Sequence, residues 1–302
     1  MSFTSEVKNE VSKLSFTKAE DIAELSALII TTSEIDETIK ITTENASVAR
    51  KIFYTIKQLF DINVKITVRK GFNFKKKYLY ILEITKNIQY ILEVLGINNN
   101  ITSNYIYDDE ETQRAYLRGI FLGCGSINDP KKSRYHLEFL VSNIETANLI
   151  NNLLNNYNLG SKILKRENRY MVYIKLSEKI SDFLRLINAT NALLYYEDIR
   201  IYRDHKNMTN RLNNCEQANV EKMIQSAQNE IKIIENLKER DMFDLLDEKD
   251  QLIASFRLKY PESSLQELSE IISIETNTKL SKSGIYHRLR KIKELSQKIS
   301  NQ

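Results

Sequence analysis

The spacing of hydrophobic residues predicts that helices alternate with strands from the start of the chain. Residues 18–31 are apolar on nearly every side, as in a buried helix, whereas residues 46–60 place their apolar positions on one helical face. Between them, Ile35, Ile39 and Ile41 lie at even spacing. This alternation predicts a strand between the two helices.

The next elements complete a unit of helices and paired strands. Residues 62–69 and 78–85 alternate apolar and polar positions and predict two strands joined by a basic loop at 71–77. Residues 86–95 return to helical spacing and are followed by Gly96, a residue suited to the left-handed position after a helix. The unit therefore combines helices with a small sheet.

The order of these elements repeats later in the chain. Residues 25–29 match residues 117–121, and residues 78–97 match residues 170–189, both at an offset of 92 positions. The intervening helix matches at an offset near 99, so about seven residues are gained around 129–134 and about seven are lost in the later hairpin. We therefore predict an α+β fold with two pseudo-symmetric lobes.

Glycines mark the helix that opens the second lobe. Three of the seven glycines fall within residues 117–126, and Gly119 and Gly123 share one helix face. Glycine is unfavourable inside a helix, so a close helix crossing is the simplest explanation. We expect the partner to be the duplicate helix, with Ala27 and Thr31 at the matching positions. A phosphate-binding loop is the alternative, but the Lys-Ser/Thr pair of such a loop is missing.

The last sixty residues predict a helix-turn-helix domain. Residues 252–260 and 264–272 have helical spacing, and Ser281 is a suitable N-cap for a third helix. Residues 279–298 hold seven basic residues and the single acid Glu294. Two short helices followed by a longer basic one are typical of this DNA-binding motif.

The third helix supplies the candidate DNA-binding residues. Side chains early in a recognition helix face base edges, and basic side chains along it contact phosphates. A solvated basic face is the alternative interpretation. The candidates for base edges are Lys282, Ser283, Tyr286, His287 and Arg290, and those for phosphates are Arg288, Lys291 and Lys293.

Further basic residues lie outside this domain. Residues 195–219 are rich in Arg, His and Asn, which indicates either a polar connection whose asparagines cap the following helix or a phosphate-contacting arm. We expect four segments: lobe 1 at 1–100, lobe 2 at 101–192, a connection with a linker helix at 193–240, and the helix-turn-helix domain at 241–302. The possible secondary DNA contacts are Lys70, Lys75, Lys76, Lys77, Arg203 and Arg211.

Composition narrows the class of protein. Two cysteines 91 positions apart and three histidines argue against a disulfide scaffold and a structural zinc site. No apolar run approaches 18 residues, and the first residues lack a signal-peptide pattern. We therefore expect a cytoplasmic protein without membrane contact. The net charge of +4 says little about partners, because the basic residues are clustered.

The helices that open the two lobes resemble the motif helices of the LAGLIDADG homing-endonuclease fold, most closely at residues 117–126. In that family an acid near the end of each motif helix holds a divalent metal. The matching positions here are Thr32 and Cys124, neither of which is a carboxylate. Divalent-metal hydrolysis needs hard oxygen ligands. We therefore predict no catalytic residue, no metal and no cofactor, although Glu34 and Asp129 lie nearby in sequence.

Degenerate lobes followed by a helix-turn-helix resemble the WhiA family of bacterial DNA-binding regulators over the full length. The stretches at 2–8, 211–219 and 280–289 carry this resemblance. It implies a non-enzymatic, sequence-specific regulator of transcription that binds double-stranded DNA at the nucleoid, with roles in sporulation, cell division or chromosome segregation. The alternatives are an active endonuclease and an interaction module for transcription or cell-division proteins.

Overall fold

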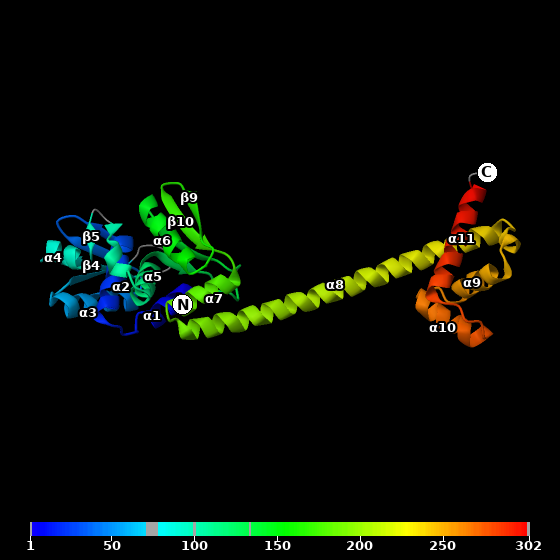
Figure 1. The fold of residues 1–302 in the computed structure, drawn as a ribbon, viewed down its shortest axis with the longest axis horizontal. Helices are drawn as coiled ribbons and strands as arrows, with labels where there is room; N and C mark the ends of the chain where they lie inside the picture. Colours follow the sequence, from blue (N-terminus) through cyan, green and yellow to red (C-terminus); the bar gives the residue numbers. More distant parts are fainter. Residues whose placement is uncertain (1, 71–77, 99–100, 133, 301–302) are drawn as a thin grey trace. The chain divides into compact units, whose positions relative to one another are not determined.

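The computed structural model describes residues 2–70, 78–98, 101–132 and 134–300. These residues form two compact units, which divide between residues 204 and 205. The N-terminal unit combines helices with sheets, and the C-terminal unit is helical (Figure 1). The predicted α+β class is confirmed. The finer segment boundaries at 100, 192 and 240 stay predictions.

Two four-stranded antiparallel sheets form the N-terminal unit, one in each lobe. Their strand orders are β1-β2-β4-β3 and β7-β8-β10-β9, so the second sheet repeats the topology of the first. This confirms the predicted duplication. The strands are β1 (Ser33–Ile35), β2 (Ile39–Thr43), β3 (Lys65–Lys70) and β4 (Tyr78–Ile84) in lobe 1, and β7 (Gly125–Ile127), β8 (Leu137–Val141), β9 (Lys162–Arg166) and β10 (Arg169–Ile174) in lobe 2.

The helices repeat in the same order between the strands. A short hairpin and a 3₁₀ turn connect the lobes, formed by β5 (Ile97–Asn98), β6 (Ile101–Thr102) and η1 (Asn104–Tyr107). An additional helix, α1 (Phe3–Val11), precedes the first lobe. The repeated helices are α2 (Lys18–Thr32), α3 (Ala46–Phe60) and α4 (Ile88–Val94), followed by α5 (Glu110–Cys124), α6 (Ile144–Asn156) and α7 (Ser177–Leu186).

The single strand predicted from Ile35, Ile39 and Ile41 is wrong. The chain reverses there, so that Ile35 pairs with Ile39 across a hairpin and Asp36 N donates to Thr38 O at 3.1 Å. Even spacing of apolar residues is compatible with both arrangements, because all three side chains face the core in each. The tight turn between Ile35 and Ile39 distinguishes the hairpin from a single strand.

The offset between the two lobes changes along the chain. Gly96 and Asn188, both left-handed with φ of 60°, follow matching helices 92 positions apart, as predicted. In the sheets, however, Leu82 pairs with Ile41 and Val172 pairs with Phe139, which places β10 90 positions after β4. A shift of two residues keeps each side chain on its original face of the sheet. The predicted offset of 92 therefore holds for the ends of α4 and α7 and is two residues too long for β4 and β10.

Helices α2 and α5 cross closely at the glycines. A Cβ on Gly119 would collide with the carbonyl oxygen of Glu24 and would lie 2.9 Å from the Cβ of Ala27. A Cβ on Gly123 would collide with the hydroxyl of Thr31. The prediction that the glycine helix packs on its own duplicate is confirmed.

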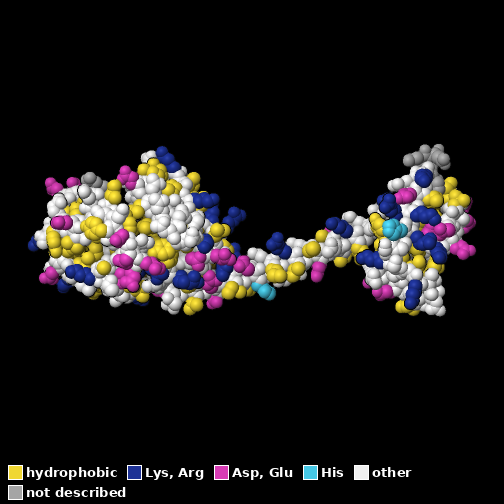
Figure 2. All heavy atoms as spheres, viewed as in Figure 1, with side chains coloured by type: hydrophobic (Ala, Val, Ile, Leu, Met, Phe, Trp, Pro, Cys, Tyr) yellow, Lys and Arg dark blue, Asp and Glu magenta, His cyan; other side chains and the backbone are white. Residues whose placement is uncertain are grey.

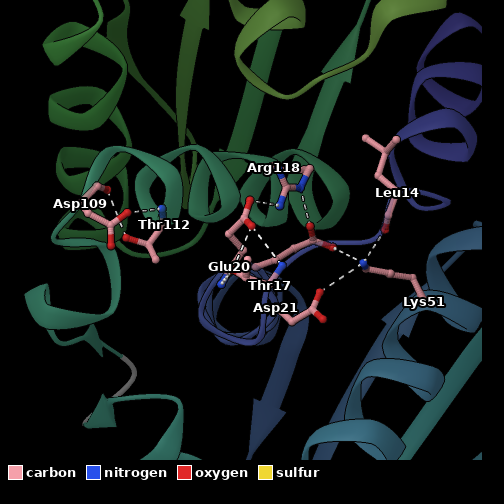
Figure 3. A network of polar contacts seen from close by, with 9 residues as sticks. Leu14, Thr17, Glu20, Asp21, Lys51, Asp109, Thr112 and Arg118 are labelled. Carbon is pink, nitrogen blue, oxygen red and sulfur yellow. Dashed lines mark hydrogen bonds and ion pairs between the residues drawn. The ribbon is translucent and has the colours of Figure 1, made fainter.

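A buried ion pair joins the same two helices. Arg118 of α5 is 1 % exposed, and its Nε donates to Glu24 Oε2 of α2 at 2.5 Å. Its guanidinium carbon lies 3.4 Å from the centre of the Phe16 ring, and Lys51 of α3 lies 3.7 Å from the other Glu24 oxygen. Figure 3 shows Arg118 pointing from α5 toward the acids of α2. This network fixes the register of the pair, since breaking it would leave a buried charge unpaired.

The polar stretch 195–219 is itself helical, so its interpretation as a connection whose asparagines cap a following helix is wrong. It lies within α8 (Thr190–Glu239), a helix of 50 residues. Glu10 of α1 caps the start of α8, because its carboxylate accepts from Asn191 N at 2.7 Å and from Ala192 N at 3.0 Å. The asparagines of this stretch therefore do not cap a following helix.

The C-terminal unit packs three helices on the end of α8. They are α9 (Glu248–Lys259), α10 (Leu265–Thr276) and α11 (Lys282–Ser300), preceded by the turn η2 (Phe243–Leu245). Ser264 forms a capping box with Glu267, and Ser281 accepts from Gly284 N at 3.1 Å. The predicted N-cap Ser281 is confirmed. The core of this unit consists mainly of Ile234, Leu237, Ile253, Leu268, Ile272, Ile285, Leu289 and Ile292.

Candidate nucleic-acid interface

Helices α10 and α11 are joined by a short turn at residues 277–281. Asn277 ends α10 in the left-handed conformation, with φ of 57°. Ser269 of α10 donates its hydroxyl to the Leu280 carbonyl at 2.5 Å, which ties the turn back onto the helix. Two helices linked by such a turn form the helix-turn-helix arrangement, in which the second helix is the recognition helix.

One face of α11 packs into the core of the C-terminal unit, so the polar residues of the helix face outward. Ile285, Leu289 and Ile292 are buried at helical spacing. Figure 2 shows Lys and Arg side chains gathered over the helices of this unit. Of the predicted contact residues Arg288 is half-buried, and the exposed ones are Lys282, Ser283, Tyr286, His287, Arg290, Lys291 and Lys293.

Two of the predicted phosphate contacts are paired with acids of α9. Arg288 Nη1 lies 2.7 Å from Asp250 Oδ1 and 3.2 Å from Asp247 Oδ1. Lys291 Nζ lies 2.9 Å from a carboxylate oxygen of each acid. The hydrogen bond from Lys291 lowers the pKa of Asp247 to about 2 and, in turn, the bond to Asp247 raises the pKa of Lys291. These two cations therefore hold α11 against α9.

The remaining predicted contacts are more accessible. Arg290 makes an i,i+4 ion pair with Glu294 at 2.9 Å, which is weak because both side chains are exposed. The ring of Tyr286, 53 % exposed, contacts that of His287. Within the part of the chain that the structure describes, Lys282 has neither a hydrogen bond nor an ion pair. Lys282, Arg290 and Lys293 thus form the accessible cationic surface of the recognition helix.

The possible secondary DNA contacts differ in exposure and in their partners within the protein. Lys70 is exposed at the end of β3, and Arg211 is exposed on α8. Arg203 Nη1 donates to the Pro130 carbonyl at 2.5 Å, and its guanidinium lies 5.0 Å from the Tyr135 ring centre. Arg203 therefore anchors the start of α8. Lys75, Lys76 and Lys77 lie outside the described residues.

The positions that hold metal in homing endonucleases have internal partners. Thr32 donates its hydroxyl to the Leu28 carbonyl at 2.7 Å, and Cys124 donates its thiol to the Ile120 carbonyl at 3.5 Å. No group of three or more His, Cys, Asp or Glu side chains that could hold a metal ion occurs in the described ranges. Of the two nearby acids, Glu34 is exposed in β1, and Asp129 accepts from the Tyr195 hydroxyl at 3.3 Å.

A lysine from α1 lies beside Cys124. Burial lowers the pKa of Lys8 to about 8, opposed by the charges of Cys124 and Glu44. Burial also raises the pKa of Cys124 to about 12, so the thiol is neutral at pH 7. The ammonium group lies 5.7 Å from the centre of the Phe121 ring. A cation already occupies the neighbourhood of this helix end, which disfavours a divalent metal there.

The sequence-based interpretation missed both Lys8 and the acids of α9. The pairing of Asp250 with Arg288 connects residues 38 positions apart, which no local pattern indicates. One signal was available for Asp247. It is the N-cap of α9 and accepts from Asp250 N at 2.9 Å, and Asp at an N-cap is a common pattern.

Among the described residues, no helix has the length and apolar character needed to cross a bilayer.

Known proteins resemble this chain over its whole length. Residues 18–98 match the WhiA N-terminal LAGLIDADG-like domain, residues 113–206 the WhiA LAGLIDADG-like domain, and residues 209–296 the WhiA C-terminal HTH domain. A probable cell division protein WhiA from Staphylococcus aureus (strain JH9) is 41% identical over 100% of this chain and 98% of its own length. The relative from Staphylococcus haemolyticus, named likewise, is 41% identical over 99% of this chain and 98% of its own.

A solved structure is similar to this chain over its whole length. The crystal structure of full-length DUF199/WhiA from Thermatoga maritima superposes with a TM-score of 0.60 at 27% identity and covers 99% of both chains. A separate structure of the N-terminal LAGLIDADG domain of DUF199/WhiA superposes with a TM-score of 0.52 over 61% of this chain and 89% of its own. With two degenerate LAGLIDADG-like lobes and a C-terminal helix-turn-helix domain, the chain belongs to the WhiA family.

Proposed function

We propose that this protein is a non-enzymatic, sequence-specific regulator of transcription that binds double-stranded DNA through α11. The observation that carries the proposal is the polar surface of α11, where Lys282 and Arg290 are exposed while Ile285, Leu289 and Ile292 are buried in the core. Side chains at such positions reach base edges when a recognition helix enters the major groove. Relatives named as probable cell division proteins support a role linked to cell division.

The proposed function includes where the regulator acts, which genes it controls and what the two lobes do. The regulator acts in the cytoplasm at the nucleoid, and its targets include genes for division, chromosome segregation or sporulation. The two lobes serve as a scaffold that adds a second contact, either with DNA near Lys70 or with transcription or cell-division proteins. Arg211 on α8, within the C-terminal unit, adds a further phosphate contact. No ion or cofactor is needed for these roles.

Selection of bound duplexes from a random pool by the full-length protein tests the proposal. Enrichment of a defined motif, and occupancy of that motif in genome-wide mapping of bound DNA, is the expected result. Recovery of the input pool without enrichment would overturn sequence-specific binding and would favour an interaction module for the division machinery.

The rival activity is DNA cleavage. Phosphodiester hydrolysis with Mg²⁺ needs carboxylate ligands at the helix ends, where Thr32 and Cys124 stand instead. Supercoiled plasmid incubated with the protein and Mg²⁺ or Mn²⁺ should stay intact. Cleavage that is lost on changing Glu34 or Asp129 to Ala would establish a nuclease.

A further inference from the structure

Helix α8 presents a row of side-chain amides on one face. The spacings of three, four and three residues place the members on adjacent turns of a single side. All are exposed, and all lie in the C-terminal unit. The amide row consists of Asn207, Asn210, Asn214 and Gln217.

The amides of this row are available for intermolecular hydrogen bonds. Among the described residues, the side chains of Asn207, Asn210 and Asn214 have no hydrogen-bond partner. Gln217 donates to Glu221 Oε1 at 2.9 Å, one turn along the helix. Asparagine in a helix interior is roughly half a kcal/mol less favourable than alanine. Helix stability therefore does not account for the amide row.

Basic residues flank the amide row. Lys206 precedes Asn207 and Arg211 follows Asn210, and both are exposed. Neither forms an ion pair within the described part of the chain. Lysine and arginine beside a row of hydrogen-bonding side chains suit a partner that combines phosphates with base edges.

The opposite face of the same segment carries two exposed apolar side chains. Met208 and Leu212 lie one turn apart on it and are 64 % and 55 % exposed. That face could pair with a second copy of the chain, but such pairing would leave the amide row unexplained. Amides combined with basic flanks favour nucleic acid over a protein partner.

We propose that the amide row binds base edges in the major groove of double-stranded DNA, with Lys206 and Arg211 on the adjacent phosphates. A carboxamide offers a donor and an acceptor together, which matches adenine N6 and N7, and the major groove is wide enough for an α-helix. This inference rests on the proposal that the chain binds duplex DNA, and it adds a reading surface separate from α11.

Alanine variants of the full-length protein test it on the duplex enriched from a random pool. Asn210→Ala and Asn214→Ala should each bind this duplex about tenfold more weakly and should bind random duplex as before. A repeated selection with each variant should lose the base preference at one position. Asn219→Ala on the other face is the matched control and should stay within twofold. Because alanine favours helix, these changes should not unfold α8.

Two results would overturn the inference. The first is wild-type affinity and an unchanged motif for both variants, while Lys282→Ala loses specific binding; the proposed function would then survive without the amide row. The second is wild-type affinity of Asn210→Ala and Asn214→Ala, together with an oligomer of the wild-type protein that Leu212→Lys dissociates in sedimentation equilibrium. That result would assign this segment to self-association. Failure to enrich any duplex would instead contradict the proposed function itself.

Discussion

Arg288 of the recognition helix binds Asp250 at the start of α9, with Nη1 2.7 Å from Oδ1. The Asp250 side chain is fully buried, so this carboxylate has no access to water as an alternative partner. The same acid accepts from Lys291 one turn along α11. Two contacts on successive turns fix the rotation of α11 about its own axis, and this rotation directs Lys282 and Arg290 outward.

Replacing Asp250 with Asn should destabilise the C-terminal unit. The change removes a buried charge that satisfies two cations, and a hydrogen bond to a charged group contributes about 2 kcal/mol. Native-state hydrogen exchange of α11 amides in the full-length protein measures the loss. Glu248→Gln, an exposed change on the same helix, should stay within about 0.5 kcal/mol. Equal protection in both variants would show that the pair does not hold α11.

Stability of the C-terminal unit should fall in acid through Asp247. Its pKa is lowered from 3.8 to about 2, chiefly by the hydrogen bond from Lys291. Because the folded pKa lies below the unfolded value, the stabilisation is fully present above about pH 4 and is lost as the pH falls toward 2. Asp247→Asn can still cap α9 and should flatten the pH dependence of thermal unfolding between pH 5 and 2. Parallel curves for the two proteins would contradict this assignment.

Lys8 should make stability rise with pH in alkali. Burial lowers its pKa from 10.5 to about 8, so between these values the unfolded chain binds more protons than the folded one. Stability of the N-terminal unit should therefore gain a rising contribution between pH 8 and 10. Urea unfolding gives the free energy of unfolding of wild type and of Lys8→Met at several pH values in this range. The difference between the two slopes of this free energy against pH is the contribution of Lys8. Identical slopes would mean that Lys8 is not held in a desolvated site.

A methyl group at Gly119 should disrupt the crossing of α2 and α5. The added Cβ would collide with the backbone of Glu24, which has no rotamer to escape, and overpacking of this kind costs about 1–3 kcal/mol. The matched change is Gly284→Ala in α11, where the nearest atom is the Ser281 hydroxyl at 3.3 Å. That variant should be neutral or more stable by up to about 1 kcal/mol. Chemical denaturation of both proteins makes the comparison, and a neutral Gly119→Ala would refute the close crossing.

Local patterns predicted most of the fold. Ser281 was identified as an N-cap from residue type and position alone, and it accepts the expected bond from Gly284 N. Gly119 and Gly123 indicated a close helix crossing because glycine inside a helix needs a compensating contact. The repeat then identified α2 as the partner. Each of these inferences rests on a property that one residue or one helical turn carries.

Features that depend on distant residues were not predictable. Arg118 was read only as part of the glycine motif, yet it forms a buried pair with Glu24, 94 positions away. Arg288 and Lys291 were expected to contact phosphates, and nothing near them in sequence indicated the acids of α9. The helical state of residues 195–219 was missed because asparagine disfavours helix on local propensity.

The central claim is that α11 reads DNA sequence, and one measurement tests it most directly. Dissociation constants of full-length Arg290→Ala and Lys293→Ala are compared on the selected duplex and on random duplex. Loss of a base contact should weaken Arg290→Ala by about 1–3 kcal/mol on the selected duplex only, whereas loss of a phosphate contact in Lys293→Ala should weaken both duplexes alike. Equal losses of Arg290→Ala on the selected and random duplexes would contradict base reading by α11.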